Sequence, residues 1–183
     1  GRGDGGRGSA VAKRLIRAKV RNSVGTVGHG IPRSEQRQCS LLAIKNAASE
    51  LERRQPLTLA ALLGIEGRVA FHYFRAWHSL PLRWKGIGRK AIPNEWLYIG
   101  PRQSVIGNKI GSRNRRASHP LNAMLNYAYA ILDSQIRIQV ACEGYDPTIG
   151  FLHASNPGRD PFVLDLMEPV RPVFDRCILQ VVP

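Results

Sequence analysis

Apolar residues recur at three- and four-residue steps along most of this chain, a spacing that predicts helices with one buried face. In residues 57–77 five such side chains share a face: Leu59, Leu63, Ala70, Tyr73 and Trp77. The pattern also predicts helices over residues 10–21 and 34–54, and a longer helix that Pro120 opens in its first turn. Because alternating, strand-like patterns are scarce, we expect a mainly α fold.

The remaining segments lack this periodicity. We expect residues 1–9 to form a flexible Gly/Arg-rich leader and residues 23–32 to form a glycine-rich loop. Residues 79–118, rich in glycine, proline and basic side chains, predict a long and partly irregular connection. The chain is therefore expected to be a single helical-bundle domain over residues 10–183.

Acidic side chains stand at positions where the pattern calls for apolar ones. Asp165 and Glu168 lie in an apolar run that follows His153, and Glu66 falls on the apolar face of residues 57–77. A buried carboxylate is costly unless it is paired or bound to a metal. One imidazole with several carboxylates suits magnesium or manganese, so a shared ion is the economical interpretation.

Each of these residues also has a structural interpretation. Asp165 and Glu168 have the spacing of a capping box, with Asp165 as N-cap. His153 could be a hydrogen-bonded core histidine, and Glu66 could reach water or pair with an arginine. Two glycines flank Glu66, Gly64 and Gly67, and glycine inside a helix usually reflects close approach of another element or a ligand.

The charge balance points to an anionic partner. The chain has a net charge of +14 and a pI near 10.7, values typical of nucleic-acid-binding domains. Between residues 71 and 120 many lysines and arginines, interleaved with Trp77, Trp84, Trp96 and Tyr98, face a single acid, Glu95. Three arginines are closely packed there: Arg113, Arg115 and Arg116. Cations bind phosphates and aromatic rings stack on bases, so we expect DNA or RNA contact, the alternative being a solvated basic surface.

Other compositional signals exclude several classes of protein. Cys39, Cys142 and Cys177 are widely spaced and never form a C-x-x-C pair, which fits reduced thiols and gives no zinc site. No apolar run approaches the length of a membrane span, and the first residues do not resemble a signal peptide. We expect a cytoplasmic protein with no membrane partner.

Four motifs, taken in order, resemble the helical catalytic domain of the CRISPR-associated integrase, the DNA-cutting and DNA-joining subunit that captures new spacers. They are EGRVAFHYF, RNRRASHPLNAMLNYAYAIL, GYDPTIGFLH and LDLMEPVRPVFD. The resemblance covers roughly residues 13–183. It does not include the small β-rich N-terminal domain usual in the family, which we do not recognise in this chain.

The resemblance implies a metal site built from Glu66, His153 and Glu168, with Asp165 beside them to orient the histidine or help bind the ion. It implies Mg²⁺ or Mn²⁺ as cofactor, branched DNA or DNA with free 3′ ends as substrate, a homodimer in the full-length family, and a small companion subunit of the adaptation complex. The arginines of residues 113–116, together with Asn126 and Tyr129 from a polar helix stripe, are the expected DNA contacts.

Three functions follow as hypotheses. The first is a metal-dependent DNA endonuclease and integrase acting in CRISPR spacer acquisition, an antiviral defence. The second keeps this chemistry in a transposase-type integrase of a mobile element. The third is a basic nucleic-acid-binding module without catalysis, which predicts salt-dependent binding and no metal-stimulated cleavage.

Overall fold

Helices make up nearly all of the regular structure. The computed structural model describes residues 4–53, 58–78, 80–84, 91–99, 119–153 and 160–181, with the backbone alone described for residues 4–7. The helices are α1 (Asp4–Gly30), α2 (Glu35–Arg53), α3 (Leu59–Trp77), the 3-10 helix η1 (Asn94–Trp96), α4 (Pro120–Cys142), α5 (Pro161–Met167) and α6 (Arg171–Val181). Within these ranges no strand forms, and an isolated β-bridge joins Pro81 to Tyr98. The predicted mainly α fold is confirmed.

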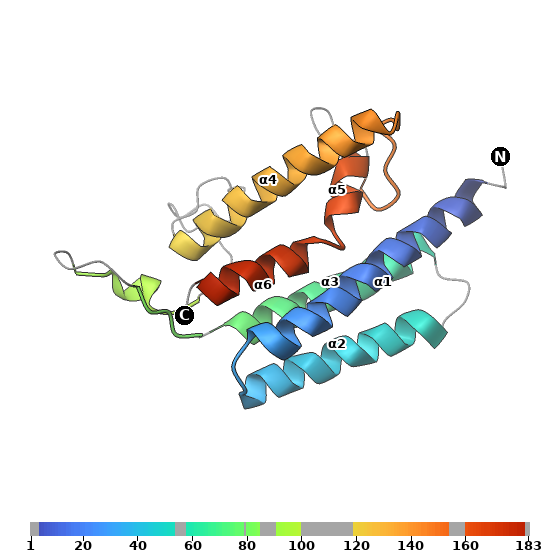
Figure 1. Cartoon of the computed structure of the whole chain (residues 1–183). Helices are drawn as coiled ribbons and strands as arrows, with labels where there is room; N and C mark the ends of the chain where they lie inside the picture. The colour runs from blue at the N-terminus through green and yellow to red at the C-terminus, as the bar shows by residue number, and fades with distance from the viewer. Residues whose placement is uncertain are drawn as a thin grey trace, which may run out of the picture.

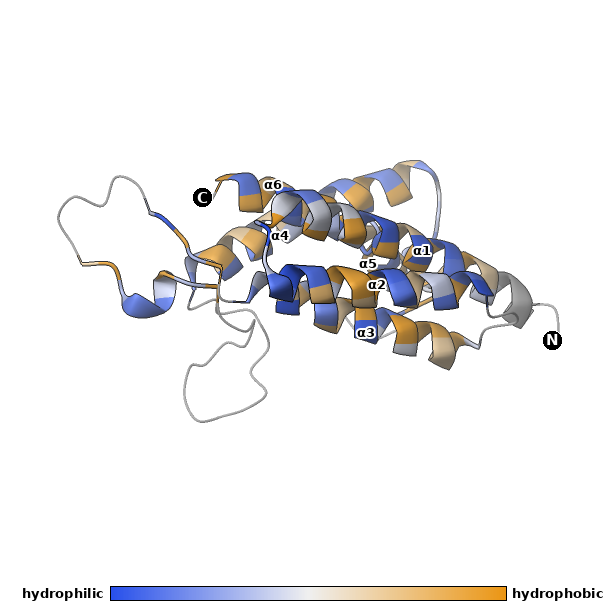
Figure 2. Ribbon diagram, turned by 90° about the horizontal axis from the view of Figure 1, so that it is seen from below, coloured by the Kyte–Doolittle hydropathy of each residue, from blue (hydrophilic) through white to orange (hydrophobic). Residues whose placement is uncertain are grey.

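Helices α1, α2 and α3 pack side by side (Figure 1). Their inward faces form one apolar core, which includes Ile16 of α1, Ile44 and Leu51 of α2, and Ile65 and Trp77 of α3. Apolar and polar residues alternate along the ribbons (Figure 2), as expected for helices with one buried face. Helix α3 begins after Thr58, whose side chain accepts a hydrogen bond from the Ala61 amide at 3.2 Å and so caps the first turn.

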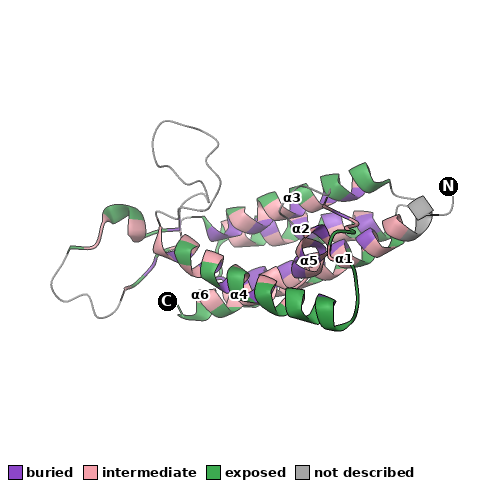
Figure 3. Cartoon of the chain, turned by 90° about the horizontal axis from the view of Figure 1, so that it is seen from above, coloured by how far each residue is buried: buried purple, intermediate pink, exposed green. Residues whose placement is uncertain are grey.

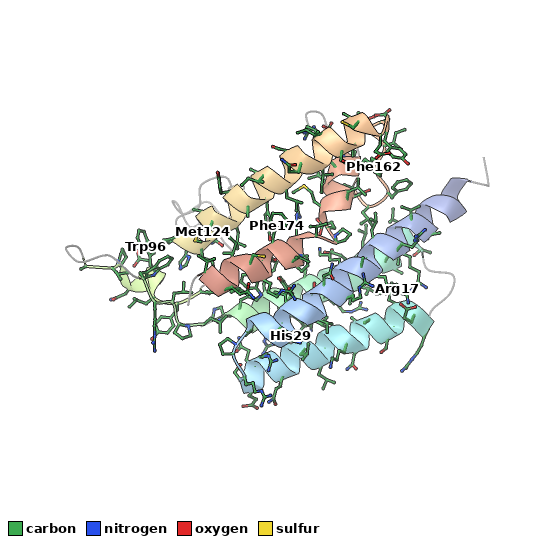
Figure 4. All side chains as sticks on the ribbon, in the orientation of Figure 1. Arg17, His29, Trp96, Met124, Phe162 and Phe174 are labelled. Carbon is green, nitrogen blue, oxygen red and sulfur yellow. The ribbon has the colours of Figure 1, made fainter. Side chains whose placement is uncertain are left out.

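Helices α4, α5 and α6 form a second group with its own apolar cluster. Its buried members are Leu132, Val140, Val163 and Met167, with Phe162 and Phe174 packed against them (Figure 4). Helix α6 lies between α4 and α1 and so joins the two groups (Figure 1). Apart from Leu132 and Val140, the C-terminal part of α4 is mostly exposed (Figure 3).

Two further observations concern the described residues. Cys39, Cys142 and Cys177 are free and exposed. No helix in the described ranges combines the length and the apolar content that a membrane span requires.

The predicted helices over 34–54, over 57–77 and after His119 are confirmed by α2, α3 and α4. The glycine-rich loop over 23–32 is wrong, because α1 continues to Gly30, and α1 also includes residues 4–9 of the expected leader. Tertiary contacts outweigh the low helix propensity of glycine here. Ser23 and Thr26 are buried, and the Thr26 hydroxyl donates to the carbonyl of Pro172 near the start of α6.

The predicted buried face of α3 is half right. Tyr73 and Trp77 are buried, but Leu59 and Leu63 are exposed, and Leu62, Ile65 and Val69 take the inward positions. Two apolar stripes overlap on this helix, and packing against α1 and α2 selects the second. The two glycines beside Glu66 have no close neighbour: a Cβ on Gly64 or Gly67 would meet no described atom within 4 Å. The close approach expected there is absent from the described residues.

A candidate metal centre built on a histidine and three carboxylates

Asp165 organises the turn that carries His153. Its carboxylate, fully buried in α5, accepts hydrogen bonds from the backbone amides of Phe151 (2.5 Å), Leu152 (3.0 Å) and His153 (3.1 Å). It also contacts Nδ1 of His153 at 2.7 Å. Burial alone would raise the pKa of Asp165, but the hydrogen bonds from His153 and the three amides lower it below its usual value. An ionised carboxylate only accepts, so Nδ1 carries a proton, and in the neutral imidazole Nε2 then holds the lone pair.

Gly150 allows this turn to close. A Cβ at this position would lie 2.6 Å from the carbonyl oxygen of His153 and 2.6 Å from Cβ of Pro161. No other residue type fits without a backbone shift, because the turn brings the residues before and after the 154–159 segment into direct contact. Glycine therefore lets the chain bring His153 back over α5.

Glu168 lies next to the free nitrogen of this histidine. It is the C-cap residue of α5, 6% exposed, and its Oε1 is 3.9 Å from Nε2 of His153. Arg171 donates to Oε1 at 2.6 Å, and Lys19 of α1 donates to Oε2 at 2.5 Å. Burial would raise the pKa of Glu168, but the positive charges of Lys19 and Arg171 outweigh it and hold the pKa below its usual value. Glu168 is therefore ionised near neutral pH.

Glu66 reaches the same place from α3. Its Oε1 accepts from Nζ of Lys19, the ammonium that also bonds Glu168. One lysine thus links two carboxylates from distant parts of the chain (Figure 1 shows α1 beside both α3 and α6). The side chain of Glu66 is 25% exposed, so the site borders solvent on this side.

A chain of contacts connects the predicted residues: Lys19 bonds Glu66 and Glu168, Glu168 lies beside His153, and His153 contacts Asp165. They do not form a ready set of ligands. Across the described residues no group of three or more histidine, cysteine or acidic side chains is arranged to hold a metal ion. Lys19 lies between two of the expected ligands, and Asp165 already accepts four hydrogen bonds. The capping-box interpretation is wrong, because Asp165 lies inside α5 and Glu168 ends it.

The expected DNA contacts divide into two sets. Arg113, Arg115 and Arg116 lie outside the described residues. Asn126 and Tyr129 are half-buried on α4. The Tyr129 hydroxyl donates to Asp175 at 2.5 Å, and the guanidinium of Arg171 stacks over the Tyr129 ring at 5.2 Å. In the structure the Tyr129 ring therefore supports Arg171, which in turn bonds Glu168.

Sequence reasoning missed three charged residues at this centre: Lys19, Arg171 and Asp175. Asp175 is 1% exposed and accepts from Tyr73 and Tyr129. Burial, followed by the nearby charge of Asp175, raises the pKa of Tyr73 well above its usual value, so Tyr73 stays a donor. For Asp175 the sequence did offer a signal, because it is, like Asp165, an acid that follows apolar residues.

These residues define a class of protein: a helical domain in which a half-buried ammonium group bonds two carboxylates from separate segments, with an imidazole and a third carboxylate next to one of them. Comparison with known proteins names the class. The chain belongs to the Cas1 family, because the family model described as CRISPR associated protein Cas1 matches residues 3–95 and 102–183.

Curated relatives agree with this assignment. The chain is 40% identical over 122 residues to a CRISPR-associated endonuclease Cas1 of Archaeoglobus fulgidus, covering 66% of this chain and 31% of the relative. It is 33% identical over 182 residues to a CRISPR-associated exonuclease Cas4/endonuclease Cas1 fusion of Rhodospirillum rubrum, covering 98% and 28%. A Cas1 endonuclease of Korarchaeum cryptofilum is 30% identical over 175 residues, covering 94% and 48%. The chain thus spans less than half the length of each relative.

Solved structures share the fold. A chain of a partial Cas6-RT-Cas1–Cas2 complex superposes with a TM-score of 0.72 at 19% identity, covering 96% of this chain and 46% of that one. A casposase bound to integration product superposes with a TM-score of 0.62 at 23% identity, covering 98% and 44%. The six-helix arrangement of the described residues is therefore the one found in these proteins.

Proposed function

We propose that this chain is the catalytic domain of a metal-dependent DNA endonuclease and integrase that cuts and joins phosphodiester bonds during CRISPR spacer acquisition. The observation that carries the proposal is that Lys19 bonds both Glu66 and Glu168, while His153 lies beside Glu168. Family membership and relatives named as Cas1 endonucleases support it. The mobile-element alternative would use the same residues, and the casposase likeness fits either biology because it concerns the fold.

The residues of the site fit a magnesium or manganese ion. Glu66 and Glu168 offer carboxylate oxygens, and Nε2 of His153 offers a neutral nitrogen, a donor set that suits these metals. A cation already bonds both carboxylates here, so the position favours positive charge. We propose that these three residues hold Mg²⁺ or Mn²⁺, with manganese at least as effective because of the imidazole. The ion would supply Lewis acidity at a phosphodiester oxygen.

The remaining residues of the site prepare these ligands. Asp165 fixes the tautomer of His153 and holds its ring against α5, as a carboxylate behind a ligating histidine does. Arg171 bonds Glu168 and is itself stacked on Tyr129, so it orients that carboxylate. These contacts cost no rearrangement during the reaction, which is the advantage of a preorganised polar site.

We further propose that DNA is held through its backbone. The net charge of +14 favours phosphate binding, and Arg113, Arg115 and Arg116 are the strongest candidates because no acid lies near them in sequence. Asn126 could line the site from α4. A homodimer and a small companion subunit are part of the proposal, and likeness to a chain of a Cas6-RT-Cas1–Cas2 complex supports the companion subunit.

The test is nicking of branched DNA by the wild-type chain, by Glu168→Ala and by Glu143→Ala, each in Mg²⁺, in Mn²⁺ and in EDTA. Glu143 is an exposed glutamate at the end of α4 and serves as the matched control. We expect cleavage by the wild type and by Glu143→Ala in either metal, and none by Glu168→Ala or in EDTA. Equal cleavage in EDTA would remove the metal-dependent mechanism, and binding with no cleavage at all would favour the non-catalytic module.

A further inference from the structure

Lys19 is a cation held by two carboxylates, and the proposed function gives it no role of its own. Its side chain is 15% exposed, and its ammonium bonds Oε1 of Glu66 and Oε2 of Glu168. Most lysines keep their head group in water, because burying an ammonium is costly without partners. Here two carboxylates supply those partners.

The backbone of Lys19 is held in place by its neighbours. Asn22 and Thr26, one and two turns further along the same face of α1, donate to the carbonyls of Pro169 and Pro172. Ile16 and Val20 are buried in the core beneath. Helix α1 therefore cannot move away from the Glu168 segment without breaking several contacts, so only the flexible side chain of Lys19 can change position.

Lys19 also separates like charges. Glu66 and Glu168 bond the same ammonium, so their carboxylates lie close together in a partly buried site, and without a cation their negative charges would repel each other. The ammonium neutralises part of this charge. A divalent cation bound to the same two oxygens would do so more strongly, but it would be repelled by an ammonium left beside it.

We propose that Lys19 is a positioning residue that holds Glu66 and Glu168 together in the metal-free protein and has to leave both before a divalent cation binds. This inference rests on the proposed metal-dependent function and adds a residue to it. Lys19 lowers the free energy of the metal-free state. Its two contacts must be broken before metal binds, which weakens the net affinity for metal. In exchange, the two carboxylates stay in place when no metal is present.

The experiment is calorimetric titration of the full chain with Mn²⁺. We expect Lys19→Met to bind Mn²⁺ at least about tenfold more tightly than wild type, since even one lost ionic hydrogen bond to the metal-free state corresponds to that factor. Lys19→Gln keeps most of the side-chain length and loses the charge, so its affinity for Mn²⁺ should also rise. It is the second variant in case Lys19→Met folds poorly. Lys19→Arg, which keeps the charge, should stay near wild type.

Thermal unfolding gives a second readout. In EDTA the Lys19→Met variant should melt below wild type, and saturating Mn²⁺ should raise its melting temperature by more than it raises that of wild type. Lys13→Met, the same substitution six residues earlier on α1, is the control and should change neither quantity. A merely structural role for Lys19 predicts lower stability without tighter metal binding.

Two outcomes would overturn the inference, and they are distinguishable. If Lys19→Met and Lys19→Gln bind Mn²⁺ no more tightly than wild type while Glu168→Ala abolishes binding, the metal site stands and the role of Lys19 is wrong. If Glu168→Ala binds Mn²⁺ like wild type, or no variant binds it, the proposed metal site fails and the role of Lys19 fails with it.

Discussion

At the scale of single residues, the centre depends on how one buried carboxylate is satisfied. Asp165 has no access to water, and its two oxygens accept three backbone amides and the His153 ring. A carboxylate in this setting is stable only while every contact is made, since an unpaired buried charge is costly. Asp165 therefore determines both the stability of the turn and the orientation of His153.

Replacement of Asp165 by asparagine should lower the free energy of unfolding by about 3 kcal/mol, the upper end of the range for hydrogen bonds to a charged group. The amide cannot accept all four donors, because one of its two heteroatoms is itself a donor. Asp133→Asn is the control, since Asp133 pairs with Arg137 on an accessible part of α4 and such pairs contribute about 0–1 kcal/mol. Urea unfolding of both variants measures the difference, and equal stabilities would contradict it.

Acid should destabilise the metal-free protein through the same residues. The folded-state pKa values of Asp165 and Glu168 are lowered, so their contribution is complete above the unfolded-state pKa values and is lost as pH falls through the folded ones. With reference values near 4 for both groups, we expect stability in EDTA to decline below about pH 4. The decline should be shallower in Asp165→Asn. Parallel acid limbs in the two proteins would assign the effect to other groups.

At the scale of elements, the turn after α4 and the contacts behind α6 determine where the site forms. Residues 150–153 are not helical, yet they place His153 against α5 because Gly150 lets the backbone pass close to Pro161. Asp175 of α6 accepts hydrogen bonds from the hydroxyl groups of Tyr73 on α3 and Tyr129 on α4, and so links three helices. Neither arrangement follows from the helix propensities of the residues involved.

Two glycine substitutions should have opposite effects. Gly150→Ala should destabilise the protein and weaken Mn²⁺ binding, because its Cβ would lie 2.6 Å from atoms on both sides of the turn. Gly64→Ala, on an open face of α3, should stabilise the protein by up to about 1 kcal/mol through helix propensity. Thermal unfolding and metal titration of the two variants test this contrast. A neutral Gly150→Ala would mean that the turn adjusts freely.

Tyr129→Phe distinguishes a supporting role from a DNA contact. Loss of the hydroxyl leaves one oxygen of Asp175 without this donor, and the expected destabilisation is about 1–3 kcal/mol, the usual cost of an unsatisfied buried polar group. The aromatic ring under Arg171 is retained. We expect lower stability in urea with unchanged DNA affinity. The reverse result, unchanged stability with weaker DNA binding, would support the DNA contact that the sequence predicted.

At the scale of the whole molecule, two helical groups meet at the carboxylates. Glu66 and Lys19 come from the α1–α3 group, while Asp165 and Glu168 come from α5, and α6 packs between α1 and α4. The site therefore exists only when both groups are docked. A metal ion at this boundary would stabilise the docked state by mass action, in keeping with the proposed function.

The net charge of +14 sets the expectation for DNA binding by the whole chain. Replacing Arg113, Arg115 and Arg116 with serine should weaken DNA affinity about equally for unrelated sequences and reduce the slope of log affinity against log salt, because phosphate contacts carry no base information. Fluorescence anisotropy over a salt series measures both quantities. An unchanged slope would make this stretch a solvated surface.

Much of the fold and the list of candidate residues could be predicted from local signals. Helical periodicity predicted α2, α3 and α4, because the apolar spacing of a helix can be read from its own residues. Acids inside apolar runs marked Glu66, Asp165 and Glu168, because such positions are costly wherever the chain folds. The motif resemblance then indicated the family, which the family model confirms.

The sequence by itself thus determined the helical class and the acidic residues that need a charged or hydrogen-bonding partner when buried. The tertiary structure decided which partner each of them has. Lys19 and Glu168 are 149 residues apart, and Lys19 and Glu66 are 47 apart. No local pattern specifies which cation will meet which carboxylate over such separations. The buried face of α3 and the continuation of α1 through its glycines were also decided by packing, because contact energies between helices exceed the small differences in propensity along them.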